Sequence, residues 1–184
     1  DFSIVGESKG INGKFGPLYK HGITILNRPD QPKWFIAENV SGLSSSNEGI
    51  TFKNILKEMR SAGYCLSVNK YKFEDYGIPQ SHHRIIIVGF RDDLKLQFRV
   101  PSPSNKIKTA REALDNIPAE ATHQELTRQS LTVVERLNYI KPGQNVWNAD
   151  IPEKLKLNVP RTKLSHIYKR IDPTKPSYTV TGSG

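Results

Sequence analysis

The sequence has almost no cysteine and no long apolar run, and each shortage excludes a class of protein. Cys65 is the single cysteine among 184 residues, so the chain forms no internal disulfide and completes no thiolate zinc site. The longest apolar runs, such as Trp34 to Ala37 and Ile85 to Val88, are of strand length and far below the roughly 20 residues that span a bilayer. We therefore expect a protein of the reducing cytoplasm, without a membrane span.

Acidic residues are also too few to balance the basic ones. Lys and Arg number 27 and Asp and Glu number 18, which gives a formal charge of +9. Such an excess favours a polyanionic partner, because basic side chains neutralise phosphates and release counterions. Many basic proteins bind no nucleic acid, so charge alone does not identify the partner.

The first hundred residues show alternating helix and strand signals. A strand, helix, strand, strand order favours an open α/β sheet, which binds ligands outside the C-terminal ends of its strands. The predicted elements are a helix from Leu18 to Leu26, a buried parallel strand from Lys33 to Val40, an amphipathic helix over Phe52 to Met59 that Gly63 ends, and strands from Tyr64 to Phe73 and Arg84 to Arg91.

The composition changes at Val100, where Pro-Ser-Pro-Ser opens a polar stretch rich in Lys, Asn and Pro. Thr109 is the predicted cap of a short helix that runs to Ile117, and a second helix is expected from Leu131 to Ile140. The remainder has weak periodicity and predicts irregular structure. We place a domain boundary here, between residues 1–98 and 99–184.

Short motifs occur along the chain in a fixed order. Asp1-Phe2-Ser3 opens a glycine-rich loop, Glu38-Asn39-Val40 ends the first predicted strand, Tyr76-Gly77-Ile78-Pro79-Gln80 precedes Arg84, and Thr179-Val180 precedes a terminal glycine run. Each motif alone has little specificity. Their order and spacing, over nearly the whole chain, resemble the C5 cytosine-specific DNA methyltransferase family of bacterial restriction-modification systems.

The resemblance implies an incomplete Rossmann-like sheet of an S-adenosylmethionine-dependent methyltransferase over residues 1–98. Residues 99–184 would form a small, mostly irregular target-recognition region. The family's Pro-Cys-Gln motif is expected immediately before Asp1, and the glycine-rich cofactor turn and closing C-terminal motif are also absent from this sequence. We therefore expect the chain alone to be inactive and the activity to belong to a parent protein.

The resemblance also assigns roles in the chemistry. In this family a thiolate adds to C6 of cytosine, and C5 then attacks the methyl group of S-adenosylmethionine. Glu38 would hydrogen-bond N3 and the exocyclic amine, and burial at the strand end is expected to let it hold a proton. Asn39 would hold the backbone of the catalytic loop, and Arg84 would contact O2 of the base.

Further residues are assigned to duplex DNA and to the cofactor. Ser3 and Thr179 would hold phosphates beside a cytosine flipped out of the duplex, to which the protein would bind as a monomer. His82 is grouped with them, although it stands where the family motif has its first arginine, which weakens one expected phosphate contact. Leu18 would pack on the adenosine of S-adenosylmethionine.

Plainer interpretations exist for these residues. Glu38 and Asn39 are also typical of a strand end that caps a turn, and Arg84 of an ordinary ion pair. Cys65 has no Pro or Gln beside it and is expected to be a small core residue. His82 and His83 point opposite ways in an extended chain, so we expect no metal site.

Two other functions remain open at this point. A related enzyme class with the same motifs methylates cytosine in transfer RNA by the same base chemistry. A DNA-binding relic without the nucleophile would keep the motifs and have no activity.

Overall fold

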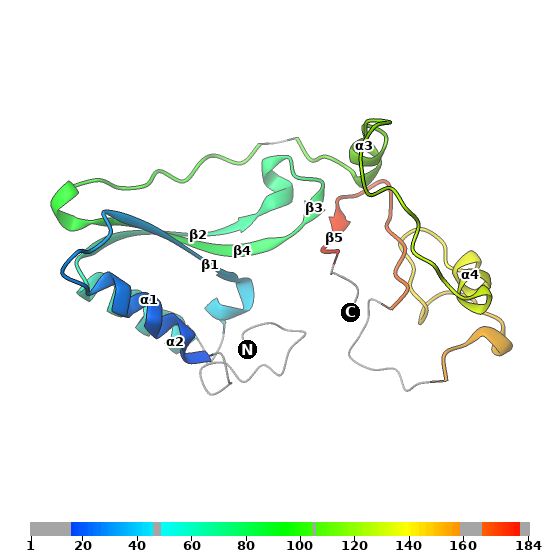
Figure 1. Cartoon of the computed structure of the whole chain (residues 1–184), viewed down its shortest axis with the longest axis horizontal. Coiled ribbons are helices and arrows are strands. Elements are labelled where there is room, and N and C mark those ends of the chain that lie inside the picture. The colour runs from blue at the N-terminus through cyan, green and yellow to red at the C-terminus, as the bar shows by residue number, and fades with distance from the viewer. Residues whose placement is uncertain (1–15, 46–48, 105, 159–166, 181–184) are drawn as a thin grey trace. The chain divides into compact units, whose positions relative to one another are not determined.

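The computed structural model describes residues 16–45, 49–104, 106–158 and 167–180. The chain forms two compact units (Figure 1). Unit 1 falls within Asp1–Lys72 and His83–Pro103, and unit 2 within Phe73–His82 and Ser104–Gly184. The units divide between residues 103 and 104, and residues 73–82 group with unit 2. The sequence-based boundary at residue 98, as a division of function, stays a prediction.

Unit 1 is built on a three-stranded sheet with the order β1-β4-β2. Its strands are β1 (Trp34–Val40), β2 (Tyr64–Lys72) and β4 (His83–Arg91), close to the predicted positions. The central strand β4 runs antiparallel to both neighbours. The parallel pairing expected for the first strand is therefore not found among the described residues, because an apolar run indicates burial and not the direction of the partner strand.

Two helices cover one side of this sheet, α1 (Tyr19–Leu26) and α2 (Ile50–Ser61) (Figure 1). In α2 the buried residues Thr51, Ile55 and Met59 recur every four positions and form its inner face. Gly63 follows the helix with a φ of +86°, a left-handed conformation that suits glycine after a helix end. The predicted amphipathic helix and its glycine stop are confirmed. The buried cluster between the layers comprises Leu26, Leu43, Ile55, Met59, Ala62, Tyr64, Ile85 and Ile87.

Phe35 and Gly89 fix the register of β1 on β4. The two residues lie directly opposite each other, and a Cβ atom at Gly89 would overlap the Phe35 ring. The same ring meets Tyr64 edge-on, with centroids 5.2 Å apart. A one-residue slip would place a side chain where only glycine fits, so this contact specifies the pairing.

The prediction that Cys65 is a small core residue is wrong, because its side chain is exposed. Successive residues of a strand point to opposite faces, and in β2 the position that turns inward belongs to Tyr64, which is 1% exposed. The Tyr64 hydroxyl donates to the Pro32 carbonyl at 2.7 Å, and burial raises its pKa.

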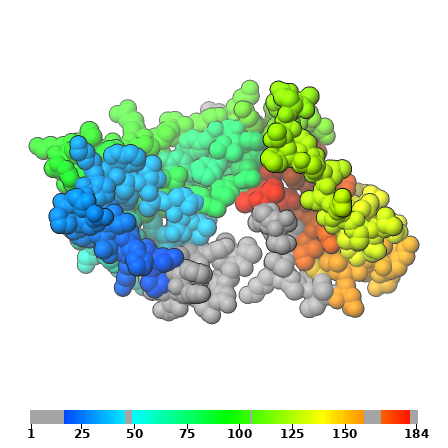
Figure 2. All heavy atoms as spheres, in the orientation of Figure 1, coloured from blue at the N-terminus to red at the C-terminus, as the bar shows by residue number. Residues whose placement is uncertain are grey.

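Unit 2 contains little regular structure. Its helices are α3 (Ala110–Leu114) and α4 (Leu131–Asn138), and two short strands, β3 (Gln80–Ser81) and β5 (Ser177–Tyr178), pair in parallel. Both helices lie at the surface in the space-filling view (Figure 2). Thr109 caps α3 as predicted, through a reciprocal pair of bonds with Glu112. The second predicted helix is confirmed, and the described residues after Pro142 are mostly irregular, as expected.

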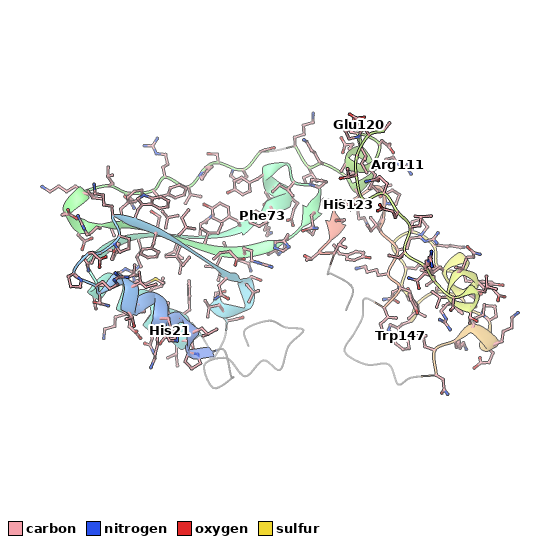
Figure 3. All side chains as sticks on the ribbon, viewed as in Figure 1. His21, Phe73, Arg111, Glu120, His123 and Trp147 are labelled. Carbon is pink, nitrogen blue, oxygen red and sulfur yellow. The ribbon has the colours of Figure 1, made fainter. Side chains whose placement is uncertain are left out.

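The core of unit 2 is a cluster of Ile140, Val146, Ile151 and Leu155. Trp147 packs against this cluster from an irregular segment (Figure 3). The Arg136 side chain is buried beside it, donates from Nε to the Leu155 carbonyl at 2.5 Å, and lies 5.6 Å from the Tyr168 ring centroid. A charged side chain therefore replaces part of the apolar packing.

None of the helices in the described ranges has the length and apolar character needed to cross a membrane.

Candidate active site and nucleic-acid interface

Two of the residues assigned to the chemistry, Glu38 and Arg84, meet at the paired ends of β1 and β4. The antiparallel register sets Glu38 opposite Ile86 and Val40 opposite Arg84, which makes Glu38 and Arg84 diagonal neighbours on one face. An ion pair joins Arg84 Nε to Glu38 Oε1. Arg84 also donates from its guanidinium to the His83 carbonyl at 2.9 Å. The structure thus brings together a carboxyl group and a fixed cation.

The expected burial of Glu38 is wrong in this structure. Its side chain is 54% exposed, whereas the Arg84 side chain is 26% exposed. Alternation along β1 explains the difference, because Glu38 shares its face with Trp34 and Ile36, which are 56% and 61% exposed. The expectation that Glu38 holds a proton therefore has no support from burial in the described residues.

Asn39 turns to the other face of β1. Its side-chain Oδ1 accepts a hydrogen bond from the Val40 backbone N–H at 2.9 Å, which bends the amide back onto its own strand. The predicted contact of Asn39 is with the loop around Ser3. That loop, and Ser3 with it, lies outside the described residues, so both assignments stay predictions.

A cavity of about 410 Å³ lies beside the C-terminal part of β1 and joins three predicted site residues. Leu18, from the turn before α1, lines this cavity together with Glu38 and Asn39. Most of the other walls are apolar and come from the core: Ala37, Leu43, Ile55, Met59 and Ile87, with Tyr19 and Gly22 from α1. Apolar walls with a few polar groups on one side are typical of sites for small organic ligands.

His82 and Thr179 also lie together, although they are 97 positions apart in the chain. The parallel pairing of β3 with β5 sets Ser81 beside Tyr178. His82 and Thr179 are the residues that directly follow these two strands, so they come to lie side by side. The His82 Nδ1 and Thr179 Oγ1 atoms are 3.0 Å apart. Thr179 Oγ1 also donates to the Ser81 carbonyl at 3.4 Å. Two predicted DNA contacts therefore form one exposed pair in unit 2.

Sequence analysis missed two aromatic residues of this region. Phe73, labelled in Figure 3, stacks on the His82 ring, with centroids 5.6 Å apart and planes 9° apart. Tyr178 donates from its hydroxyl to the Lys169 carbonyl at 2.5 Å, and the Lys169 ammonium group lies 4.7 Å from the centre of its ring. Burial raises the pKa of Tyr178. No periodicity in the sequence marks either residue, since both contacts depend on the folded chain.

Among the described residues, no group of three or more His, Cys, Asp or Glu side chains is placed to hold a metal ion.

The comparisons with known proteins found one family model and several methyltransferases that resemble this chain. A model of the C-5 cytosine-specific DNA methylase family matches residues 1–183. The type II methyltransferase M.BbvI of Brevibacillus brevis is 55% identical over 100% of this chain and 50% of its own length. M.NgoFVII of Neisseria gonorrhoeae, also a type II methyltransferase, is 35% identical over 100% of this chain and 50% of its own length.

A solved structure of a DNMT2 mutant from Spodoptera frugiperda is similar at 16% identity, with a TM-score of 0.46 over 77% of this chain and 43% of that one. The chain spans about half the length of the curated relatives that it matches. The family model, which matches nearly the whole chain, decides the assignment: the chain belongs to the C-5 cytosine-specific DNA methylase family.

Proposed function

We propose that the protein containing this chain is a DNA (cytosine-5-)-methyltransferase that transfers a methyl group from S-adenosylmethionine to C5 of a cytosine flipped out of duplex DNA. The observation that carries this proposal is the grouping of the site residues in unit 1. Leu18, Glu38 and Asn39 line one cavity, and Arg84 is paired with Glu38. Family membership supplies the reaction class.

The chemistry requires activation of an unreactive carbon atom. Cytosine C5 becomes nucleophilic when a thiolate adds to C6, and this family supplies the thiolate from its Pro-Cys-Gln motif. Glu38 would share a proton with N3, so that the ring accepts the electron pair of the new bond. Arg84 would donate to O2 and stabilise the charge that spreads over the pyrimidine.

The ion pair between Glu38 and Arg84 supports these two roles. Arg84 is held by Glu38 and by the His83 carbonyl, so its guanidinium is already oriented before a base arrives. Glu38 is exposed enough for a base to reach its carboxyl group. We assign to Asn39 the positioning of the catalytic loop.

The cavity beside Glu38 suits the cofactor. Its volume of about 410 Å³ and its apolar walls fit the flat ring system of adenosine, against which Leu18, Ile55 and Met59 would pack. S-adenosylmethionine, when bound, supplies an electrophilic methyl group on a sulfonium sulfur. Leu18 is 54% exposed in the structure and is available for such a contact.

Unit 2 is the proposed contact with DNA. The chain carries a charge of +9, which suits a duplex partner, and we assign His82 and Thr179 of unit 2, with Ser3 from the unit 1 part of the sequence, to its phosphates. Loop-rich regions on a rigid scaffold commonly carry recognition. Because M.BbvI and M.NgoFVII are named type II methyltransferases, we propose a bacterial, cytoplasmic enzyme of a restriction-modification system that acts as a monomer on one duplex site.

Transfer of labelled methyl groups from S-adenosylmethionine tests the proposal. The protein containing this chain should label duplex DNA and leave bulk transfer RNA unlabelled. Label in transfer RNA would contradict the DNA substrate and leave the base chemistry intact. Absence of label from both, with duplex binding retained, would contradict catalysis and favour a DNA-binding relic.

A further inference from the structure

We infer that His82 is a positioning residue: its imidazole orients the Thr179 hydroxyl group toward a DNA phosphate, in place of binding that phosphate itself. This inference rests on the proposed function, because it presumes that unit 2 contacts duplex DNA. It refines the sequence-based assignment, which gave both residues separate phosphate contacts.

The His82 side chain is fixed by two contacts of different kinds. One face of the ring stacks on Phe73, and Nδ1 lies 3.0 Å from Thr179 Oγ1. The backbone is tied as well, because the Phe73 N–H donates to the His82 carbonyl at 3.1 Å. A ring held in this way is pre-organised, so it loses little rotamer entropy when DNA binds.

The Thr179 side is anchored by backbone pairing. β5 lies parallel to β3, and the Ser177 N–H donates to the Pro79 carbonyl at 2.9 Å. Thr179 follows directly and remains exposed. The hydroxyl group is therefore carried by a fixed backbone next to His82 and is accessible to a ligand.

The Thr179 hydroxyl group has a single proton, and this decides which way the hydrogen bond between His82 and Thr179 runs. A threonine hydroxyl that donates to a phosphate oxygen has no second proton for His82. The His82 Nδ1 must then carry the hydrogen and donate to Thr179 Oγ1. With Nδ1 unprotonated, the hydroxyl group would donate to the ring and be lost to the phosphate.

A bond from Nδ1 also strengthens the phosphate contact. A hydroxyl group that accepts one hydrogen bond is a better donor in the next, and a bond to a charged phosphate is stronger than the long bond to the Ser81 carbonyl. The hydroxyl proton therefore turns from Ser81 to the phosphate when DNA arrives. His82 thus acts on the phosphate through Thr179, although an arginine occupies its place in the family motif.

Two His82 substitutions separate the ring's stacking from its hydrogen bond. His82→Phe keeps the stack on Phe73 and removes both ring nitrogens. His82→Asn loses the stack and keeps an amide donor near the place of Nδ1. His21→Phe, at an exposed position of α1 in unit 1, controls for the removal of a surface imidazole (Figure 3). Circular dichroism and Trp147 fluorescence of each variant should match those of the wild type.

The measurement is the dissociation constant for a fluorescent duplex of mixed sequence, over a series of salt concentrations. We expect His82→Phe to raise the dissociation constant about threefold to tenfold, the worth of one hydrogen bond. His82→Asn should recover most of this loss, and His21→Phe should have no effect. The slope of affinity against salt should be the same in every variant, because no cation leaves a phosphate.

A double substitution completes the test. If His82 acts through the hydroxyl group, His82→Phe should cost nothing further once Thr179→Val has removed it. The inference would be overturned if the factors by which the two substitutions raise the dissociation constant multiplied in the double variant. A smaller salt slope in His82→Phe would overturn it as well, and either result would indicate a direct phosphate contact. Absence of duplex binding by the wild-type protein would instead overturn the proposed function, and the inference with it.

Discussion

The two units of this chain are ordered by different interactions. In unit 1, helices and a sheet enclose one apolar cluster, and Phe35 closes over Gly89 to fix the register. In unit 2, a smaller cluster is supplemented by side chains bonded to the backbone, such as Arg136 on the Leu155 carbonyl and Tyr178 on the Lys169 carbonyl. Unit 1 also has such bonds, as from Tyr64 to the Pro32 carbonyl, but its apolar cluster is larger, so unit 2 depends more on directional bonds.

This difference agrees with the proposed roles of the two units, catalysis in unit 1 and DNA contact in unit 2. Chemistry on a base requires side chains held to within a fraction of an ångström, which packed strands provide for Glu38 and Arg84. Recognition of a DNA site varies between enzymes, and an irregular region bound by hydrogen bonds accepts such change more readily than a sheet.

The largest expected effect concerns the chemistry of unit 1 and not its stability. Glu38→Gln keeps the size of the side chain and removes its acid function, so the methyl transfer rate of the protein containing this chain should fall about 100-fold to 10,000-fold. Because the ion pair with Arg84 is exposed, the free energy of unfolding should change by less than about 1 kcal/mol.

Glu135→Gln is the matched control for Glu38→Gln. Glu135 forms a similarly exposed ion pair with Lys154 in unit 2, at 3.2 Å, and its loss should leave the rate unchanged. Equal losses of activity in both variants would show that charge, and not the position beside the cavity, explains the effect.

The next largest effect is on the packing of unit 1. Gly89→Ala places a methyl group inside the Phe35 ring and should destabilise unit 1 by about 1–3 kcal/mol. Each unit carries one of the two tryptophans, so the fluorescence of Trp34, recorded in a Trp147→Phe background, reports urea unfolding of unit 1.

Gly22→Ala provides the contrast within the same unit. Beyond the neighbouring backbone of α1, no atom of the described residues lies within 4 Å of a Cβ built at Gly22, so alanine should stabilise the helix by about 0.5–1 kcal/mol. A Gly89→Ala variant as stable as the wild type would refute the packing of Phe35 on β4.

In unit 2 the corresponding test removes a directional bond. Arg136→Met keeps the apolar stem and leaves the Leu155 carbonyl without its donor, which should destabilise unit 2 by about 1–3 kcal/mol. Trp147 fluorescence in a Trp34→Phe background measures the change. Arg128→Met, at an exposed position, should have no effect. A neutral Arg136→Met would show that unit 2, like unit 1, depends on apolar burial.

The smallest effect is a pH dependence at the cap of α3. Bonds from the Thr109 backbone N–H and hydroxyl group hold the pKa of Glu112 below its usual range. A lowered folded-state pKa gives stability that is complete above the unfolded value of about 4.3 and is lost as the pH falls through the folded value.

Urea midpoints from Trp147 fluorescence should therefore fall more steeply below about pH 5 in the wild type than in Glu112→Gln. Parallel pH curves for the two proteins would contradict the reciprocal cap. The effect should be absent from the Trp34 signal, since α3 belongs to unit 2.

Local patterns explain which elements the sequence predicted. Phe52 to Met59 with Gly63, and Thr109 as a helix cap, depend on neighbours a few residues away, and all formed as expected. The direction of β1, the exposure of Cys65 and the exposure of Glu38 depend on which strand lies alongside and which face is covered. Periodicity carries no information about either.

Motifs in the sequence propose the members of the site, whose roles stay predictions, and they say little about its geometry. Motif spacing placed Glu38 and Arg84 in one site, and the strand register shows how they meet. His82 and Thr179 were both assigned to DNA, but their contact across 97 positions depends on the pairing of β3 with β5. Two-residue strands leave too little sequence for such a pairing to be predicted.

The most direct test of the central claim is the identity of the methylated nucleoside. Duplex DNA labelled by the protein containing this chain would be digested completely to nucleosides and separated by chromatography against standards. The account predicts that the label elutes with 5-methyldeoxycytidine. Label in N4-methyldeoxycytidine or N6-methyldeoxyadenosine would contradict it, because methylation of an exocyclic amine requires no activation of C5 by Glu38 and Arg84.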